Sequence, residues 1–268
     1  MNGHTREELI SLTARLKNSE LKYKILESEP GLAVARNVAI KSIKTQLVSF
    51  LDDDVLLPQN YLLEVDRAFA NDATLDGLSP RITGLYDSSE TGVFKYRVKY
   101  PKFGQVTSYG ENFWIPDKFS ENHTVVKWLP GCSMTYKFSS IAEMQFSEEL
   151  MLGPTAGYSL GEDVDFSIRL NKLVGLNKIA ITHVQAKSVR DDSKIMAEAR
   201  GRWKAYLARK YPKIVSFRRA FLRLILEIIY LAIRCTFQWS RYYPLLKNRQ
   251  IQLLAFIQET LSPILVRT

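Results

Sequence analysis

The stretch "QLVSFLDDDVLLP" (residues 46–58) places three consecutive carboxylates directly after an apolar run. A short and nearly continuous apolar run is typical of a strand buried in a parallel sheet. Asp52, Asp53 and Asp54 then emerge at the carboxyl end of that strand, where open α/β sheets bind ligands. Because residues two apart on an extended chain point the same way, we expect Asp52 and Asp54 to converge and Asp53 to face away.

Two converging carboxylates suggest a metal site in this turn. Hard divalent cations such as Mg²⁺ or Mn²⁺ prefer oxygen ligands and keep sites for water and phosphate. The alternative is a solvent-exposed acidic loop, in which an aspartate run only turns the chain. An isolated run of three aspartates favours that alternative, whereas its position directly after a buried strand favours the metal.

The flanking sequence predicts an α/β fold, in which helices cover a sheet, because strand-like and helix-like segments alternate. Residues 79–140 break into short strand-like pieces, which indicates an antiparallel portion or an extended loop region. From about residue 190 onward the pattern is helical, with breaks near Pro212 and Pro244. The remaining expected elements are helix 6–20, strand 21–28, helix 31–45, strand 46–52, helix 59–72, helix 161–175 and strand 176–182.

A second acidic cluster occurs in "LGEDVDFSIRL" (160–170), at the start of an expected helix. Carboxylates at a helix N-terminus interact favourably with the helix dipole, and one such residue would need no further explanation. Three of them suggest a second acidic wall of one cleft. Asp163 and Asp165 cannot face the same way on a helix, so we expect Glu162 or Asp163 to face the cleft. Asp165 is expected to brace the turn with Arg169, its i,i+4 neighbour.

The composition is that of a globular protein with a basic surplus. The 268 residues carry a formal net charge of +9, which suggests an anionic partner: a nucleic acid, a phosphorylated ligand or an acidic membrane surface. Nucleic acid ranks last, because no recognition module is evident. Two distant cysteines predict no disulfide framework and a reducing compartment. The polar start indicates no signal peptide, and charges interrupt the longest apolar stretch (221–237), so we expect a cytoplasmic protein without a membrane span.

Four segments together resemble the family 2 glycosyltransferases of the GT-A fold, a mixed α/β sheet with flanking helices. They occur in the order and at the spacings usual for that family: "GLAVARNVAI" (31–40), "VSFLDDDVLLPQNYL" (48–62), "WLPGCSMTYKFSSI" (128–141) and "LGEDVDFSIRL" (160–170). The resemblance implies inverting transfer of a sugar from a nucleotide-diphosphate donor to a hydroxyl of a saccharide or lipid-linked acceptor. It also implies dependence on Mn²⁺ or Mg²⁺ and a place in polysaccharide or glycolipid biosynthesis.

The same resemblance assigns expected roles to individual residues. Asp163 matches the general base, with Glu162 as a neighbour that raises its pKa. For His183, a metal ligand and a plain structural histidine stand as equal alternatives. The implied metal ligands are Asp52, Asp54 and His183, and the implied donor-binding residues are Arg36, Asn37, Asp52, Asp53, Gly131 and Cys132.

The resemblance starts late in the family pattern. Family members open with a βαβ unit, roughly 35 to 40 residues at ordinary element lengths, and "MNGHTREE" resembles the segment just after that unit. Either the natural enzyme begins upstream, which the complete downstream motifs favour, or the chain is an impaired remnant. The second case leaves an alternative function as a membrane-associated scaffold. A nucleotidyltransferase would also use paired carboxylates, but it offers no role for "GED".

The sequence divides into a transferase domain, residues 1–195, and a helical C-terminal extension, residues 196–268. The extension combines apolar runs with arginines and the aromatic residues Trp239, Tyr242 and Tyr243. Such helices lie in membrane interfaces, with arginine at the headgroups. The alternative is a helical cap packed on the catalytic domain. Because the stretch is apolar on more than one face, we expect peripheral contact with the inner face of the plasma membrane.

Overall fold

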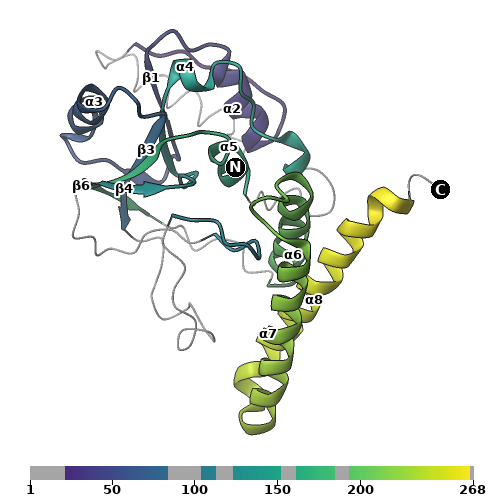
Figure 1. The fold of residues 1–268 in the computed structure, drawn as a ribbon. Helices are drawn as coiled ribbons and strands as arrows, with labels where there is room; N and C mark the ends of the chain where they lie inside the picture. Colours follow the sequence, from purple (N-terminus) through teal and green to yellow (C-terminus); the bar gives the residue numbers. More distant parts are fainter. Residues whose placement is uncertain (1–21, 84–103, 113–122, 152–160, 185–192, 266–268) are drawn as a thin grey trace, which may run out of the picture.

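The computed structural model describes residues 22–83, 104–112, 123–151, 161–184 and 193–265 (Figure 1). A six-stranded mixed sheet forms the centre, in the order β1-β5-β3-β6-β2, and β4 pairs with β6 beside that path. The strands are β1 (Leu47–Leu51), β2 (Val55–Leu56), β3 (Gly77–Thr83), β4 (His123–Val126), β5 (Ser133–Lys137) and β6 (Leu173–His183). The predicted mixed α/β sheet with flanking helices is confirmed.

The helices around the sheet are α2 (Leu32–Ile40), α3 (Tyr61–Asn71), α4 (Phe138–Ile141), the 3-10 turn η1 (Glu148–Met151) and α5 (Glu162–Ser167). They are followed by α6 (Ser193–Lys210), α7 (Phe217–Phe237) and α8 (Trp239–Leu265), which extend away from the sheet as an arm (Figure 1). The main core contains residues of α6 as well as of the sheet, among them Trp203, Tyr206 and Leu207. By contrast, α7 and α8 pack mainly on α6 and on one another.

Strand β1 was expected to be a parallel strand buried on both faces, and the structure corrects this. It pairs antiparallel with β5, in the register Leu51↔Ser133, and most of its side chains are only partly buried. It stands first in the strand order of the described sheet, so its apolar run has only β5 beside it there. The parallel pair in the described sheet is β3 with β6.

Several expected boundaries also differ. Residues 22–28 form no strand and are exposed throughout, because their alternating pattern meets no partner strand within the described sheet. The helix expected over 31–45 ends at Ile40, and Thr45 bonds the carbonyl of Leu47 in the turn into β1. The later helical break falls at Gln238, whereas Pro244 lies inside α8. The helix expected over 6–20 lies outside the described residues.

Helix α5 is shorter and β6 longer than the pattern suggested. α5 ends at Ser167 rather than near residue 175, because Asp76 draws the following segment into a turn. The Asp76 carboxylate accepts hydrogen bonds from the backbone N–H groups of Asn171 and Lys172, both at 2.9 Å. The chain then enters β6 at Leu173, which leaves α5 as a six-residue helix beside the sheet.

Candidate functional site

Strand register brings the first acidic cluster to two neighbouring segments. Because β1 ends opposite the start of β5, the N–H of Asp52 donates to the carbonyl of Cys132 at 3.1 Å. Because β2 pairs with the end of β6, with Val55 opposite His183, the preceding Asp54 lies beside that histidine. The carbonyl of Asp54 also accepts from the N–H of Val184 at 2.8 Å. The sheet therefore fixes the backbone on both sides of the turn.

Asp52, Asp54 and His183 offer three ligand atoms that all lie within 4.8 Å of one another. The His183 Nε2 atom lies 3.2 Å from Asp54 Oδ1. Two buried side-chain atoms, Asp54 Oδ1 and His183 Nδ1, have no hydrogen-bond partner within the described part of the chain. Buried polar atoms normally have a hydrogen-bond partner. Two such atoms without one therefore fit a site in which they would bind a divalent cation. Two carboxylates and an imidazole are a suitable donor set for such an ion.

Asp52 and Asp54 come together and Asp53 stands apart, as expected, but the run lies in the turn between β1 and β2 and not on an extended strand. Asp52 and Asp54 are partly buried and belong to the cluster of ligand atoms, whereas Asp53 is exposed and does not. Burial raises the pKa of Asp52, and the nearby Asp54 carboxylate adds to this, while Arg36 and His183 act in the opposite direction. The structure does not test a donor contact for Asp53, which stays a prediction.

Arg36 joins the two acidic clusters. It lies on the face of α2 that carries Ala33, Arg36, Asn37 and Ile40 into the core. One guanidinium nitrogen contacts Glu162 Oε1 at 3.0 Å, and the other donates to the Gly131 carbonyl at 2.9 Å. The second nitrogen also lies 3.6 Å from Asp52 Oδ1. The buried Arg36 guanidinium thus holds together two acidic clusters that are over a hundred residues apart in sequence.

Glu162 and Asp163 form the second half of the site. Burial and the adjacent Asp163 carboxylate raise the pKa of Glu162 to about 7, although Arg36 opposes this. Burial also raises the pKa of Asp163, against hydrogen bonds from the backbone N–H groups of Gly131 at 2.9 Å and Val164 at 2.8 Å. Glu162 is buried, whereas Asp163 is partly exposed. Of the two residues, Asp163 is therefore the more exposed one.

Gly131 lies between these groups and leaves little room for a side chain. A Cβ at this position would stand 3.3 Å from an Arg36 nitrogen and 3.5 Å from Asp163 Oδ2. Its neighbour Cys132 is buried, and burial raises the pKa of the thiol to about 12, with Asp52 and Asp163 adding to the effect. The Cys132 side chain is therefore a neutral thiol in the wall of the site.

Asn37 occupies a bracing position. Its amide nitrogen donates to the Phe146 carbonyl at 3.0 Å and to Glu148 Oε1 at 2.8 Å, and its amide oxygen accepts from the Phe146 N–H at 2.7 Å. These three bonds tie α2 to Phe146 and to the first residue of η1. The donor-binding role expected for Asn37 stays a prediction, because its described bonds serve the fold.

The sequence did not reveal how α6 holds α5 in place. The fully buried Asp165 carboxylate accepts hydrogen bonds from Ser147, Tyr206 and Tyr211 at 2.7, 2.9 and 2.8 Å. Lys210 adds an ion pair at 2.9 Å, and Arg169 pairs with Asp165 at 3.5 Å as expected. The spacing of Trp203, Tyr206 and Lys210 along one face of α6 was a signal that could have indicated this contact.

Gly161 permits the close approach of α6 to the start of α5. The residue adopts a φ of 87°, and a Cβ there would stand 2.5 Å from the Trp203 ring. Both the left-handed backbone and the lack of space therefore require glycine. The "GED" segment is thus fixed from two sides, by Arg36 in α2 and by the aromatic face of α6.

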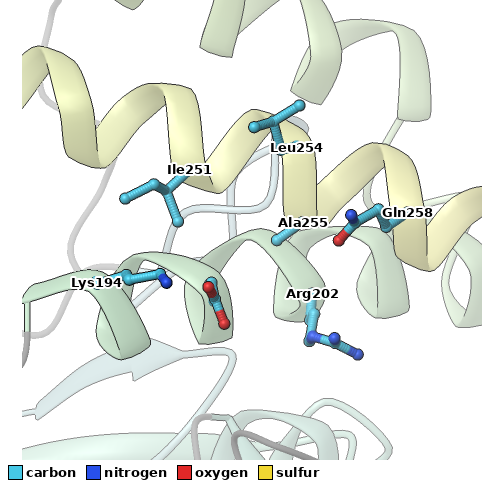
Figure 2. A pocket seen from close by; sticks show the side chains of 7 residues that line it. Lys194, Arg202, Ile251, Leu254, Ala255 and Gln258 are labelled. Atoms are coloured by element: carbon cyan, nitrogen blue, oxygen red, sulfur yellow. The ribbon is translucent and has the colours of Figure 1, made fainter.

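A separate groove lies between α6 and α8 (Figure 2). Its volume is about 220 Å³, and its lining comes entirely from the two helices: Lys194, Glu198, Arg202, Ile251, Leu254, Ala255 and Gln258. None of the residues of the acidic clusters lines it. The groove belongs to the C-terminal arm and not to the candidate site.

No protein-family profile and no curated protein sequence matches the chain. Among solved structures, the chain is similar to one titled "Crystal structure of GalNAc-T7 with UDP, GalNAc and Mn2+". The two are 16% identical in sequence, with a TM-score of 0.48, and the match covers 79% of this chain. It covers 43% of the other chain, so the present chain spans less than half the length of that structure.

Proposed function

We propose that the chain is a divalent-cation-dependent glycosyltransferase of the GT-A type, similar to family 2. It would transfer a sugar from a nucleotide-diphosphate donor to an acceptor hydroxyl, with inversion. The observation that carries the proposal is that Arg36 joins two acidic clusters. In the first cluster, buried ligand atoms have no hydrogen-bond partner among the described residues. In the second, the carboxyl pKa values are raised. We further propose polysaccharide or glycolipid biosynthesis as its setting, with a saccharide or lipid-linked acceptor.

Asp52, Asp54 and His183 would hold the cation, which would neutralise the donor diphosphate and act as a Lewis acid toward the leaving group. An imidazole in the set favours Mn²⁺ over Mg²⁺. Both cysteines are buried free thiols, which favours a reducing compartment and thus a cytoplasmic location.

Asp163 is our candidate for the general base. Each of its carboxylate oxygens accepts one backbone N–H and retains a second lone pair for the proton of an acceptor hydroxyl. Its raised pKa brings it nearer to the range in which a carboxylate removes protons efficiently. A single base acting opposite the leaving group accounts for the proposed inversion. Glu162, held by Arg36, would adjust the charge beside the base rather than contact the acceptor.

The proposal is tested by metal-dependent turnover of nucleotide sugars with the wild-type chain and three variants. Asp52→Asn, Asp54→Asn and Asp163→Asn should each reduce kcat/KM by about 100-fold or more, the scale of a lost base or metal ligand. Asp66→Asn, on the exposed side of α3, serves as the matched control and should keep its activity. Thermal unfolding of each variant separates a chemical loss from a folding loss.

The results also distinguish the rival functions. If Asp163→Asn keeps its activity, another residue is the base. If the wild-type chain binds Mn²⁺ but no nucleoside diphosphate by calorimetry, the transferase proposal fails and the scaffold alternative is supported.

A further inference from the structure

Helix α7 has two apolar faces. One is buried against α6 and α8 and carries Ala220, Leu224, Leu231 and Cys235. The opposite face is exposed to solvent. It carries Leu222, Leu226, Ile229, Ile233 and Phe237, with exposed fractions of 56, 51, 51, 56 and 81%. We call these five residues the outer stripe.

The outer stripe is continuous along the helix. Its members are separated by four, three, four and four residues, so they stay on one side of an α-helix. From Leu222 to Phe237 the stripe is about 22 Å long at 1.5 Å per residue. Scattered single apolar residues are normal on a surface, but a contiguous apolar strip of this kind marks an interaction site. Among the described helices, none has a stretch apolar and long enough to pass through a bilayer.

An exposed aromatic pair follows the end of α7 in the chain. Trp239 and Tyr243 are 61% and 43% exposed, and their rings stack with centroids 4.5 Å apart. They lie where α7 gives way to α8, at the end of the arm that is distant from the sheet (Figure 1). Exposed tryptophan and tyrosine side chains are enriched at the boundary between lipid and water.

The part of the arm that contains α7 and most of α8 carries a strong positive charge with little acidic counterpart. Between residues 211 and 258 the sequence contains eight lysines and arginines and a single acidic residue, Glu227. That carboxylate is buried and already pairs with Arg223 at 2.7 Å and Arg249 at 2.8 Å. Arg218 and Arg219 are exposed at the start of α7, on the side of the outer stripe. The surface therefore combines an apolar strip with positive charge.

We propose that the outer stripe and the Trp239–Tyr243 pair dock the chain on an anionic membrane surface, with α7 lying in the plane of the interface. Acyl chains take the apolar strip, and anionic headgroups take the arginines, as in interfacial amphipathic helices. A second copy of the chain fits less well, because pairing two α7 surfaces brings their arginines together, and the acidic residue of α7, Glu227, is buried. The inference concerns α7 and α8 alone and does not depend on the proposed transferase activity.

The test is co-sedimentation of the full chain with lipid vesicles. Vesicles of phosphatidylcholine with phosphatidylglycerol should bind the chain at least about tenfold more tightly than vesicles of phosphatidylcholine alone, and added salt should weaken the binding. The double variant Leu226→Gln/Ile233→Gln should bind about tenfold or more weakly to the mixed vesicles, because two apolar anchors are lost. Arg218→Gln/Arg219→Gln should reduce the preference for phosphatidylglycerol.

The matched control is Leu62→Gln/Leu63→Gln on α3, where two leucines are 71% and 50% exposed outside the arm. It should bind like the wild-type chain, and unfolding temperatures of all variants should show intact folds. The proposal is overturned if the wild-type chain binds neither vesicle, or if the stripe variant binds as well as the control. It is also overturned if sedimentation velocity without lipid shows a dimer that the stripe variant abolishes while vesicle binding is absent.

Discussion

Asp54 and Asp165 belong to the two acidic clusters of this chain, but their surroundings are opposite. The Asp165 carboxylate is fully buried, and side chains from the segment before η1 and from α6 donate to both of its oxygens. Asp54 Oδ1 is also buried, yet it accepts no hydrogen bond within the described residues, although His183 Nε2 lies 3.2 Å away. The protein itself satisfies the first carboxylate, whereas the second keeps a buried oxygen that no described donor satisfies. Acidic residues of similar appearance in the sequence therefore have different surroundings, one satisfied within the fold and the other a proposed metal ligand.

The pKa values of neighbouring carboxylates in α5 differ because their charged and hydrogen-bonding partners differ, and not because of burial alone. Burial acts to raise the pKa of Asp165, but Ser147, Lys210 and Tyr211 outweigh it and lower the pKa below the usual value. Two residues earlier, Asp163 has only backbone donors and the distributed charge of Arg36, and its pKa is raised. Within the six-residue helix α5, Asp165, which faces α6, thus has a lowered pKa and stays ionised. Asp163 has a raised pKa and takes up a proton more readily.

The substitution Asp165→Ala tests most directly whether the Asp165 carboxylate has a structural role. Removing the carboxylate leaves Lys210 and the hydroxyls of Tyr206 and Tyr211 without their buried acceptor. Leaving a buried donor without its acceptor typically costs about 1–3 kcal/mol, and two hydroxyls are affected, so we expect a loss of about 3 kcal/mol in the free energy of unfolding by urea. Glu143→Ala, at an exposed carboxylate, is the control and should change stability by less than about 0.5 kcal/mol. A loss at Asp165 as small as that of the control would mean that α6 does not hold α5.

The Asp54 cluster should respond to metal instead. Mn²⁺ at about 100 times its dissociation constant should stabilise the wild-type chain by about 2.7 kcal/mol, seen as a raised unfolding temperature that a chelator reverses. Asp54→Ala and His183→Ala should abolish this response, because each removes a ligand atom of the cluster. Asp165→Asn should keep it, since Asp165 lies outside the cluster. A full Mn²⁺ response in Asp54→Ala would remove the cluster as the metal site.

Local geometry explains which parts of the site could be predicted from the sequence. Asp52 and Asp54 converge as predicted, but a turn at Asp53 and Asp54 brings them together, and not the two-residue repeat of an extended chain. The place of His183 depends on the pairing of β2 with β6, and that of Arg36 on contacts that span 126 residues. The partners of Asp165 in α6 and just beyond it are 41 and 46 residues distant. Such contacts depend on how the helices pack, which no local pattern specifies.

In the fold, too, local elements could be predicted from the sequence and long-range pairings could not. Strand β1 and helix α3 were placed correctly within about two residues because their apolar patterns are strong and local. The pattern over residues 22–28 was equally regular, but it meets no partner strand in the described sheet, so no strand forms. The antiparallel direction of β1 could not be predicted either, since direction is a property of the neighbouring strand β5.

The last prediction is a difference in pH dependence between Glu162 and Asp165, which lie in the same helix α5. Burial and Asp163 raise the pKa of Glu162 to about 7 in the folded chain, from an ordinary value of 4.5. The folded state therefore holds this proton more tightly than the unfolded state, and the stability it contributes is lost as the pH rises from about 4.5 to about 7. Glu162→Gln removes that proton exchange, so its stability relative to wild type should rise across this window.

Asp165 should show the opposite sign, because its pKa is lowered: its contribution is present above the ordinary value of 3.8 and is lost as the pH falls through the folded pKa. Urea unfolding of wild type, Glu162→Gln and Asp165→Asn at a series of pH values measures both slopes. A Glu162→Gln curve parallel to wild type between about pH 4.5 and 7 would mean that Arg36 keeps Glu162 ionised throughout. In that case the proton-exchanging character would belong to Asp163 alone, which sharpens its assignment as the base.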